Sequence, residues 1–324
     1  MSKRENAVCL MNELGSCREP FLFVVDFEMN DPVILPGGQA EESGIFYSIN
    51  QYANCPPPAE AGKPFAFKKQ PVPFEEYRHA FEKVMHQLHK GNSYLLNLTF
   101  PTSIEIGLTL EEIFRASTAK YRLLFKDLFV VFSPEVFVQI RDGLISSFPM
   151  KGTIDAGIDD AEATILHDPK ELAEHSTVVD LIRNDLSSVA REVRVERFRY
   201  IDYIRTNMKD LLQVSSKITG RLPPDYYKNI GTILFTLLPA GSVTGAPKKK
   251  TVEIIKDVEK VSRGYYTGVA GYFDGENLDS GVMIRFIERT NNGLVYRSGG
   301  GITVFSNAEK EYEELLDKVY VPII

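Results

Sequence analysis

The spacing of apolar residues along the chain predicts a mixture of helices and strands. The clearest helix covers 74–90, where apolar side chains recur at helical spacing until Gly91: Phe74, Tyr77, Phe81, Val84 and Leu88. Further helices are predicted at 109–117, 169–188, 225–238, 247–259 and 307–320, and Asp168 is a plausible cap for the one that begins at 169. Strand-like runs occur at 21–27, 44–49, 143–148, 265–273, 281–288 and 294–298.

Several of these strands follow one another with no helix between them, which favours antiparallel sheets over a doubly wound parallel sheet. The expected fold class is therefore α+β, with helices packed outside the sheets. Residues 1–70 read as a short opening lobe, and 55–64, CPPPAEAGKP, as an exposed connector because clustered prolines interrupt regular structure. The 324 residues allow one large domain or two intimately packed halves.

Composition narrows the class of protein. The chain is 44% hydrophobic and 25% charged, which is typical of soluble globular proteins. Its formal net charge of -7 argues against a general nucleic-acid binder. No apolar run approaches the length that spans a membrane, and the first residues lack the apolar core of a signal peptide, so a cytoplasmic protein is expected. The three cysteines have neither zinc-site nor disulfide-framework spacing.

Two pairs of glutamates are spaced so that each pair shares a helical face. Glu171 and Glu174 lie on the helix predicted at 169–188, and Glu311 and Glu314 lie on the last helix. A solvated charged face would explain either pair. Each pair also borders an apolar stripe, and carboxylates in that position suit a hard cation such as Mg2+, which prefers oxygen ligands. The spacing alone leaves both interpretations open.

One lysine stands where a strand is expected to turn. Lys151 lies in the segment FPMKGT, residues 148–153, at the end of the predicted strand 143–148. Lysine is rarely buried without a partner, and burial lowers its pKa and makes the amine a better nucleophile. The alternative is that the stem packs against the protein while the ammonium reaches water.

Two glycine-rich segments could bring the backbone close to a ligand. The segment 239–250, PAGSVTGAPKKK, runs into a helix and could cradle an anion. Its glycine spacing fails the phosphate-loop pattern, and a simple helix-starting turn explains it equally well. The second segment, 298–301, follows a strand, where its glycines would admit a ligand or form a bulge.

Taken in order, these segments resemble the chorismate-utilising enzymes, a family that includes component I of anthranilate synthase and of aminodeoxychorismate synthase. The resemblance covers roughly 74–320 and rests on SPE (133–135), PMKGT (149–153), ELAEHSTVVDLIRNDL (171–186), PAGSVTGAPK (239–248), YYTGVAGYF (265–273), IR (284–285) and GGGITVFSNAEKEYEELLDKV (299–319). Residues 1–70 match poorly and are shorter than the usual N-terminal half. The resemblance implies two antiparallel sheets packed together and flanked by helices, with the active site in the cleft between them.

The resemblance also implies roles for particular residues. Glu174 and Glu314 would hold Mg2+, with Glu171 and Glu311 beside them. The carboxylates of chorismate would be held by Ser242, Tyr266, Arg285 and the backbone of Gly299 and Gly301. Lys151 would attack C2 of chorismate as a covalent nucleophile, and Glu135 would protonate the departing C4 hydroxyl.

Three positions bear on which family reaction is expected. Lys151 stands where aminodeoxychorismate synthases carry lysine and anthranilate synthases carry alanine, so the resemblance implies amination at C4. Leu95 replaces the lysine base of relatives that add water, which argues against isochorismate or salicylate synthesis. Gln213 stands where the family commonly has histidine, and it cannot form an imidazolium.

The expected activity is formation of 4-amino-4-deoxychorismate from chorismate and ammonia, on the route to 4-aminobenzoate and folate. The chain shows no glutaminase nucleophile motif, so glutamine-dependent activity would need a partner amidotransferase subunit. Two alternatives remain. One is anthranilate synthase component I, and the other is a catalytically inactive chorismate-binding homologue, which the departures at Leu95 and Gln213 favour.

Overall fold

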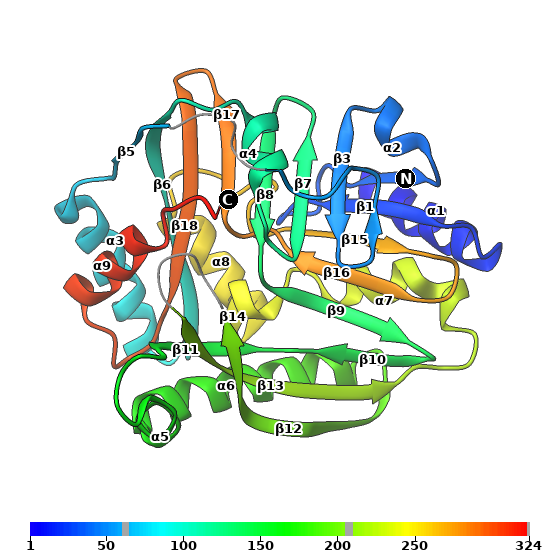
Figure 1. The fold of residues 1–324 in the computed structure, drawn as a ribbon. Helices are drawn as coiled ribbons and strands as arrows, with labels where there is room; N and C mark the ends of the chain where they lie inside the picture. The colour runs from blue at the N-terminus through cyan, green and yellow to red at the C-terminus, as the bar shows by residue number, and fades with distance from the viewer. Residues whose placement is uncertain (60–64, 205–209, 323–324) are drawn as a thin grey trace.

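The strands of this protein form two antiparallel sheets that pack against each other (Figure 1). The structure is a computed structural model that describes residues 1–59, 65–204 and 210–322. Side chains of both sheets meet in one buried cluster, which includes Val24 and Ala270 from the first sheet and Tyr47 and Val131 from the second. This arrangement confirms the predicted α+β class.

The first sheet contains nine strands within the described residues. In spatial order they are β11 (Met150–Asp155), β13 (Leu211–Arg221), β10 (Leu144–Ser147), β9 (Val136–Arg141), β16 (Leu278–Val282), β15 (Val269–Phe273), β1 (Phe21–Val25) and β2 (Val33–Pro36), with β12 (Arg191–Ile204) paired to β13. Strands far apart in sequence are neighbours in this sheet, since β9 pairs with β16 and β1 pairs with β15.

The second sheet also has nine strands within the described residues. In spatial order they are β14 (Gly245–Ala246), β6 (Leu95–Ile106), β18 (Gly293–Ile302), β17 (Phe286–Thr290), β8 (Phe129–Ser133), β7 (Tyr121–Phe125), β3 (Ile45–Ile49) and β4 (Tyr52–Ala53), with β5 (Phe67–Gln70) paired to β6. The opening residues therefore supply strands to both sheets, because β1 and β2 join the first and β3 and β4 join the second.

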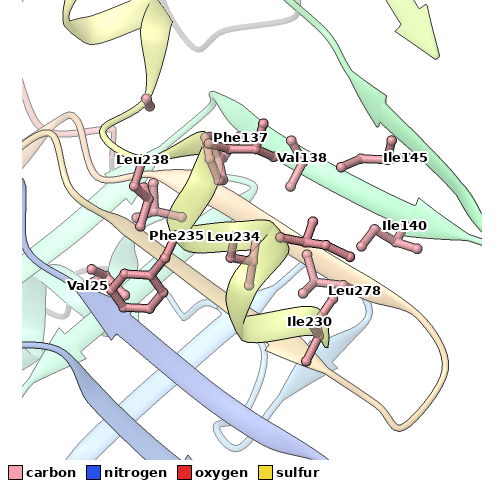
Figure 2. Packing of buried hydrophobic residues seen from close by; sticks show 14 of the residues in the cluster. Val25, Phe137, Val138, Ile140, Ile145, Ile230, Leu234, Phe235, Leu238 and Leu278 are labelled. Atoms are coloured by element: carbon pink, nitrogen blue, oxygen red, sulfur yellow. The ribbon is translucent and has the colours of Figure 1, made fainter. Parts of the chain in front are cut away.

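Helices cover the outer faces of the sheets (Figure 1). They are α1 (Lys3–Ser16), α2 (Gln39–Glu42), α3 (Phe74–His89), α4 (Leu110–Ala116), α5 (Ala161–His167), α6 (Pro169–Ser187), α7 (Ile230–Leu237), α8 (Lys248–Val258) and α9 (Ala308–Asp317), with 3-10 turns at Tyr226–Asn229 and Gly241–Val243. Apolar residues of α1, α6 and α7 share one core with the first sheet. Figure 2 shows α7 lying over this core, with Leu234 near Ile140 and Leu278. Residues of α3, α8 and α9 form another core with β6 and β18.

Local sequence explains where α6 and α9 begin. The carboxylate of Asp168 accepts a hydrogen bond from the backbone N–H of Glu171 at 3.0 Å, which confirms the predicted cap of α6. The side chain of Asn307 caps α9 by accepting from the backbone N–H of Lys310 at 3.1 Å. Both caps fix the first turn of a helix that carries a glutamate pair.

The prediction of one strand over 281–288 is wrong in an informative way. The chain leaves the first sheet at the end of β16 and enters the second sheet at β17, so Met283, Ile284 and Arg285 cross between the sheets. Arg285 has a φ of 53°, which no regular strand residue adopts. Apolar residues stand on both sides of this crossing. The hydrophobic pattern of a strand therefore continues through it, although the chain changes from one sheet to the other.

A second crossing runs beside the first. The chain passes from β8 in the second sheet to β9 in the first through Pro134 and Glu135. The two crossings are joined by backbone hydrogen bonds, from Val282 N–H to the Glu135 carbonyl at 3.0 Å and from Phe132 N–H to the Arg285 carbonyl at 3.1 Å. Glu135 and Arg285 are therefore brought to the same seam between the sheets.

Three other elements were not predicted correctly. No helix was predicted at α1, although Ser2 and Glu5 form a capping box there. The predicted strand at 265–273 begins only at Val269, because 264–267 form a turn in which Thr267 has a φ of 60°. The long hairpin of β12 and β13 was also not predicted. Of the predicted connector 55–64, residues 60–64 lie outside the described residues, and 55–59 have no regular structure.

Candidate functional site

The predicted site residues come from eight places in the chain. Glu135 and Arg285 lie on the two crossings, and Tyr266 lies in the turn before β15. Lys151 is in β11, Ser242 is in the 3-10 turn at Gly241–Val243, and Gly299 and Gly301 are within β18. The glutamate pairs project from α6 and α9. Several of these residues are in contact in the folded chain.

Lys151 is held among acidic side chains. Its Nζ lies 2.7 Å from Oε2 of Glu174, whose side chain is only 6% exposed, and the lysine side chain itself is 25% exposed. Burial lowers the pKa of Lys151, but the negative charges of Glu174, Glu314 and Glu171 raise it by more, so the pKa lies above its usual value. Burial and the nearby carboxylates oppose each other, and in this state the carboxylates prevail, so Lys151 is a paired ammonium.

Gly152 allows α6 to approach the lysine strand. Its φ is +80°, and a Cβ atom at this position would lie 2.6 Å from Oε2 of Glu171. The side chain of Gln213, in β13, donates to the carbonyl of Gly152 at 3.3 Å and to Oγ1 of Thr153 at 3.1 Å. Gln213 thus supports the backbone next to Lys151, through contacts that need no charge.

A second lysine, Lys318, faces the same region and was missed by the sequence analysis. Its Nζ lies 2.7 Å from Oε1 of Glu314 and donates to the carbonyl of Gly299 at 2.9 Å. Burial lowers the pKa of Lys318, and the charges of Arg285 and Lys151 add to this effect against that of Glu314. The spacing of four residues from Glu314 was the available signal, but it reads equally well as an exposed helical ion pair.

The glycines of β18 bring the two acidic helices close to the lysines. A Cβ at Gly301 would lie 3.7 Å from Nζ of Lys151 and 3.2 Å from Cδ1 of Leu95. A Cβ at Gly300 would lie 3.6 Å from Oε2 of Glu311 and 3.8 Å from Nζ of Lys318. This run lies inside a regular strand paired to β6, so the alternative of a bulge or tight bend is wrong, and backbone without side chains faces the charged groups.

Glu135 is the acidic group on the seam between the sheets. The hydroxyl of Ser242 donates a hydrogen bond to its Oε1. Burial raises the pKa of Glu135, and the hydrogen bond from Ser242 and the charges of Arg285 and Lys318 offset this only in part. A glutamic acid whose pKa is raised keeps its proton to a higher pH, as a general acid requires.

Arg285 and Tyr266 lie near this acid. The guanidinium carbon of Arg285 is 5.3 Å from the centre of the Tyr320 ring, a cation–π contact. Tyr266 is buried, with 3% of its surface exposed. Burial raises the pKa of Tyr266 strongly, whereas the nearby charges of Arg263 and Arg285 lower it less. A neutral phenol and a fixed guanidinium are suitable donors for a carboxylate.

His175 is a buried neighbour that the sequence analysis did not single out. It follows Glu174 on α6, and its Nε2 is 2.7 Å from Oγ of Ser216 in β13. Burial lowers its pKa to about 4, and the charges of Arg199 and Lys151 contribute. The backbone N–H of Ser216 donates to the carbonyl of Pro149, so this contact links α6 to the segment that precedes Lys151.

The acidic residues suit a divalent cation by chemistry. Glu174 and Glu311 are buried, so a solvated charged face does not describe them, whereas Glu314 is exposed over 52% of its side chain. No group of three or more potential ligands is arranged as a metal cage within the described residues. Mg2+ does not need such a cage, because it is usually held by one or two carboxylates with water and substrate oxygens. The donor set therefore fits magnesium.

The loop 239–250 does not form a phosphate loop. After its 3-10 turn it forms β14, which pairs with the start of β6, and α8 follows from Lys248. Gly245 has a φ of 124°, and a Cβ there would lie 1.8 Å from the carbonyl oxygen of Leu95. This glycine serves close strand packing, while the turn before it presents Ser242 to Glu135.

Comparison with known proteins identifies the family to which this chain belongs. A family model described as chorismate binding enzyme matches residues 38–323. A protein of Pasteurella multocida (strain Pm70), named as an uncharacterized PabA-like protein, is 51% identical over 313 residues, which are 96% of this chain and 97% of that protein. Aminodeoxychorismate synthase component 1 of Salmonella typhimurium is 34% identical over 260 residues, which are 75% of this chain and 56% of that protein.

A solved structure has the same fold. MenF, the menaquinone-specific isochorismate synthase from Escherichia coli, superposes with a TM-score of 0.71 over 97% of this chain and 80% of that one, at 17% identity. At this identity the likeness concerns the fold. In the part of the chain that the structure describes, no helix is both long enough and apolar enough to span a membrane.

Proposed function

Because the chain belongs to the chorismate-binding enzymes, we propose that it converts chorismate and ammonia to 4-amino-4-deoxychorismate, a precursor of 4-aminobenzoate and folate. The observation that carries the proposal is the position of Lys151. Its amine pairs with the buried Glu174 and lies next to the glycine strand β18, where a small molecule can approach the backbone. A lysine that only reached for solvent would not be held there.

In this reaction Lys151 and Glu135 act on the same substrate. The neutral amine of Lys151 forms a bond to C2, the ring double bond shifts, and the C4–O bond breaks as Glu135 donates a proton and water leaves. Ammonia then forms a bond to C4, the double bond shifts back, and the C2–N bond breaks to release Lys151. The Glu135 carboxylate recovers a proton from the nitrogen that has been added, so the cycle balances.

The other site residues bind and orient the substrate. Arg285 and Tyr266 are donors for the carboxylates of chorismate, and the backbone of Gly299 and Gly301 lets the ring approach closely. The hydroxyl of Ser242, which donates to the Glu135 carboxylate, becomes a third donor when Glu135 is protonated. Glu174 and Glu314, with Glu171 and Glu311 beside them, would hold magnesium. Bound Mg2+ would offset the negative charge of these glutamates and of the substrate's ring carboxylate.

Ammonia would come from a glutamine amidotransferase subunit that acts with this chain in the cytoplasm. The likeness to a protein named aminodeoxychorismate synthase component 1 supports a division of labour between two components. Under this proposal the chain acts as one chorismate-binding catalytic unit, in which residues 74–320 are the core and 1–70 a short N-terminal lobe.

Two alternatives have support from particular residues. Anthranilate synthase component I shares most of the site motifs, but Lys151 argues against it. A catalytically inactive homologue is favoured by Leu95, which fills the space next to Gly301, and by the neutral Gln213. Both alternatives predict a different outcome in the assay that follows.

The deciding experiment identifies the product made from chorismate, ammonium and magnesium, and any covalent adduct formed without ammonia. We expect 4-amino-4-deoxychorismate in the complete reaction. Without ammonia, intact-mass and peptide mapping should place an adduct on Lys151 and not on the neighbouring Lys318. Lys151→Ala should abolish the adduct, whereas Lys318→Ala should retain it on Lys151. Anthranilate as product, or no turnover and no adduct in the wild type, contradicts the proposal.

A further inference from the structure

A small cavity of about 30 Å3 is lined in part by Glu135 and Ser242. It is enclosed by β9 and β10, by α6, by the end of α7 and by the turn that follows α7. Figure 2 shows Phe137 and Val138 of β9, which line it, beside Leu238 at the end of α7. A water-sized molecule needs about 10–15 Å3, so the cavity has room for about two.

The lining of the cavity contains a second acidic residue besides Glu135. Asp185 pairs with Lys248 at 2.7 Å, and the two side chains are 18% and 19% exposed. A Cβ atom at Gly241, next to Ser242, would lie 2.9 Å from Oδ2 of Asp185. The cavity is therefore shared by the candidate general acid and an ion pair that reaches solvent in part.

The polar atoms of the lining favour a molecule with several hydrogen-bond donors. Glu135 and Asp185 contribute carboxylate oxygens. The hydroxyl proton of Ser242 is donated to Glu135, and that of Ser147 is donated to the carbonyl of Phe137 at 3.0 Å, so both hydroxyl oxygens are left to accept. The remaining walls are mainly apolar, and include Val138 and Leu237. Ammonia, with three N–H donors and one lone pair, matches this lining better than water does.

The proposed reaction requires ammonia on this side. The new nitrogen bonds to C4, the carbon from which the hydroxyl leaves under protonation by Glu135, so ammonia has to arrive next to Glu135. We propose that the cavity is an ammonia-binding site that delivers ammonia to C4, with the Asp185 carboxylate in its wall. This inference rests on the proposed function, because another reaction would not need a nitrogen donor at Glu135.

The experiment changes the cavity volume and measures the ammonia step separately from the chorismate step. Val138→Ile adds one methylene group to the lining, and Val84→Ile, in α3 and far from the cavity, is the matched control. We expect Val138→Ile to form the ammonia-free Lys151 adduct normally and to keep the KM for chorismate. Its KM for ammonium should rise about tenfold, a typical effect of one methylene in a tight pocket, whereas Val84→Ile should leave it unchanged.

An enlarged variant provides a second measurement that does not depend on tolerance of the added methylene. Val138→Ala should let methylamine replace ammonia and yield the N-methylated product, and Val84→Ala should not. An unchanged KM for ammonium in Val138→Ile, or no gain of methylamine use in a folded Val138→Ala, overturns the cavity assignment while the adduct and product remain. Absence of adduct and product in the wild type instead overturns the proposed function, and the inference with it.

Discussion

At the scale of single residues, the site depends on how each charged group is surrounded. Glu135 and Lys151 have pKa values raised from their ordinary ones for different reasons, namely burial for the acid and neighbouring carboxylates for the amine. The first favours the protonated acid, and the second means that Lys151 has to lose a proton before it attacks. The active form has a neutral Lys151 and a protonated Glu135, so the pH profile of kcat/KM should be bell-shaped. Because the amine has the higher pKa of the two groups, the low-pH limb reports Glu135 and the high-pH limb reports Lys151.

The hydroxyl of Ser242 offers a test of the low-pH limb. Its hydrogen bond to Glu135 stabilises the carboxylate and lowers the pKa, so Ser242→Ala should raise this pKa further. Because Glu135 has the lower pKa of the two groups, the low-pH limb of kcat/KM should move to higher pH. Stopped assays across a pH series would measure the shift. A limb that stays in place or moves to lower pH would exclude Glu135 as the group that titrates.

Some residues of the site could be predicted from the sequence and others could not. The spacing of Glu171 and Glu174 indicated a shared face, which requires only the period of a helix. Lys318 could not be distinguished from an ordinary surface lysine, because its burial comes from the contact with Gly299 in a distant strand. The pairing of Lys151 with Glu174 likewise depends on how α6 packs on the first sheet.

At the scale of elements, periodic patterns predicted the helices well and the strands less well. The helix α3 was placed to within one residue because its buried face repeats at helical spacing. The β12–β13 hairpin was missed because arginines and glutamates are frequent in β12, which interrupts the alternation of apolar residues along the strand. The crossing at 283–285 was missed because period and hydrophobicity are the same on both sides of it. Neither signal reports which sheet a strand joins.

The two acidic helices carry the prediction about magnesium. Glu174→Gln in α6 and Glu314→Gln in α9 should each weaken magnesium binding and lower turnover, because an amide keeps the shape but removes the charge that a hard cation needs. Glu313→Gln, at an exposed neighbouring position, is the matched control and should behave as the wild type. Calorimetric titration with Mg2+ and magnesium-dependent rates would measure both effects. Unchanged Mg2+ binding in both variants would show that Glu174 and Glu314 do not hold the metal.

At the scale of the whole molecule, the chain belongs to the chorismate-binding enzymes and its sequence shows no glutaminase nucleophile motif. We expect the purified chain to use ammonium salts and not glutamine, and addition of a cognate amidotransferase to confer glutamine use. Product formation with each nitrogen source, with and without the second protein, measures this directly. Glutamine-dependent turnover by the chain alone would be evidence against two separate components.

The paired crossings between the sheets also affect the order in which the protein can fold. The backbone carbonyl of Glu135 accepts a hydrogen bond from Val282, which lies at the end of β16 and is therefore far along the chain from Glu135. Lys151 lies close to β18 and α9, which are synthesised later still. Contacts between residues so distant in sequence form slowly, because loop-closure entropy opposes them. Lys151 and Glu135, the proposed nucleophile and acid, are therefore synthesised long before their surroundings, and we expect that a nascent chain does not bind chorismate. Activity should appear only with the last cooperative step of folding.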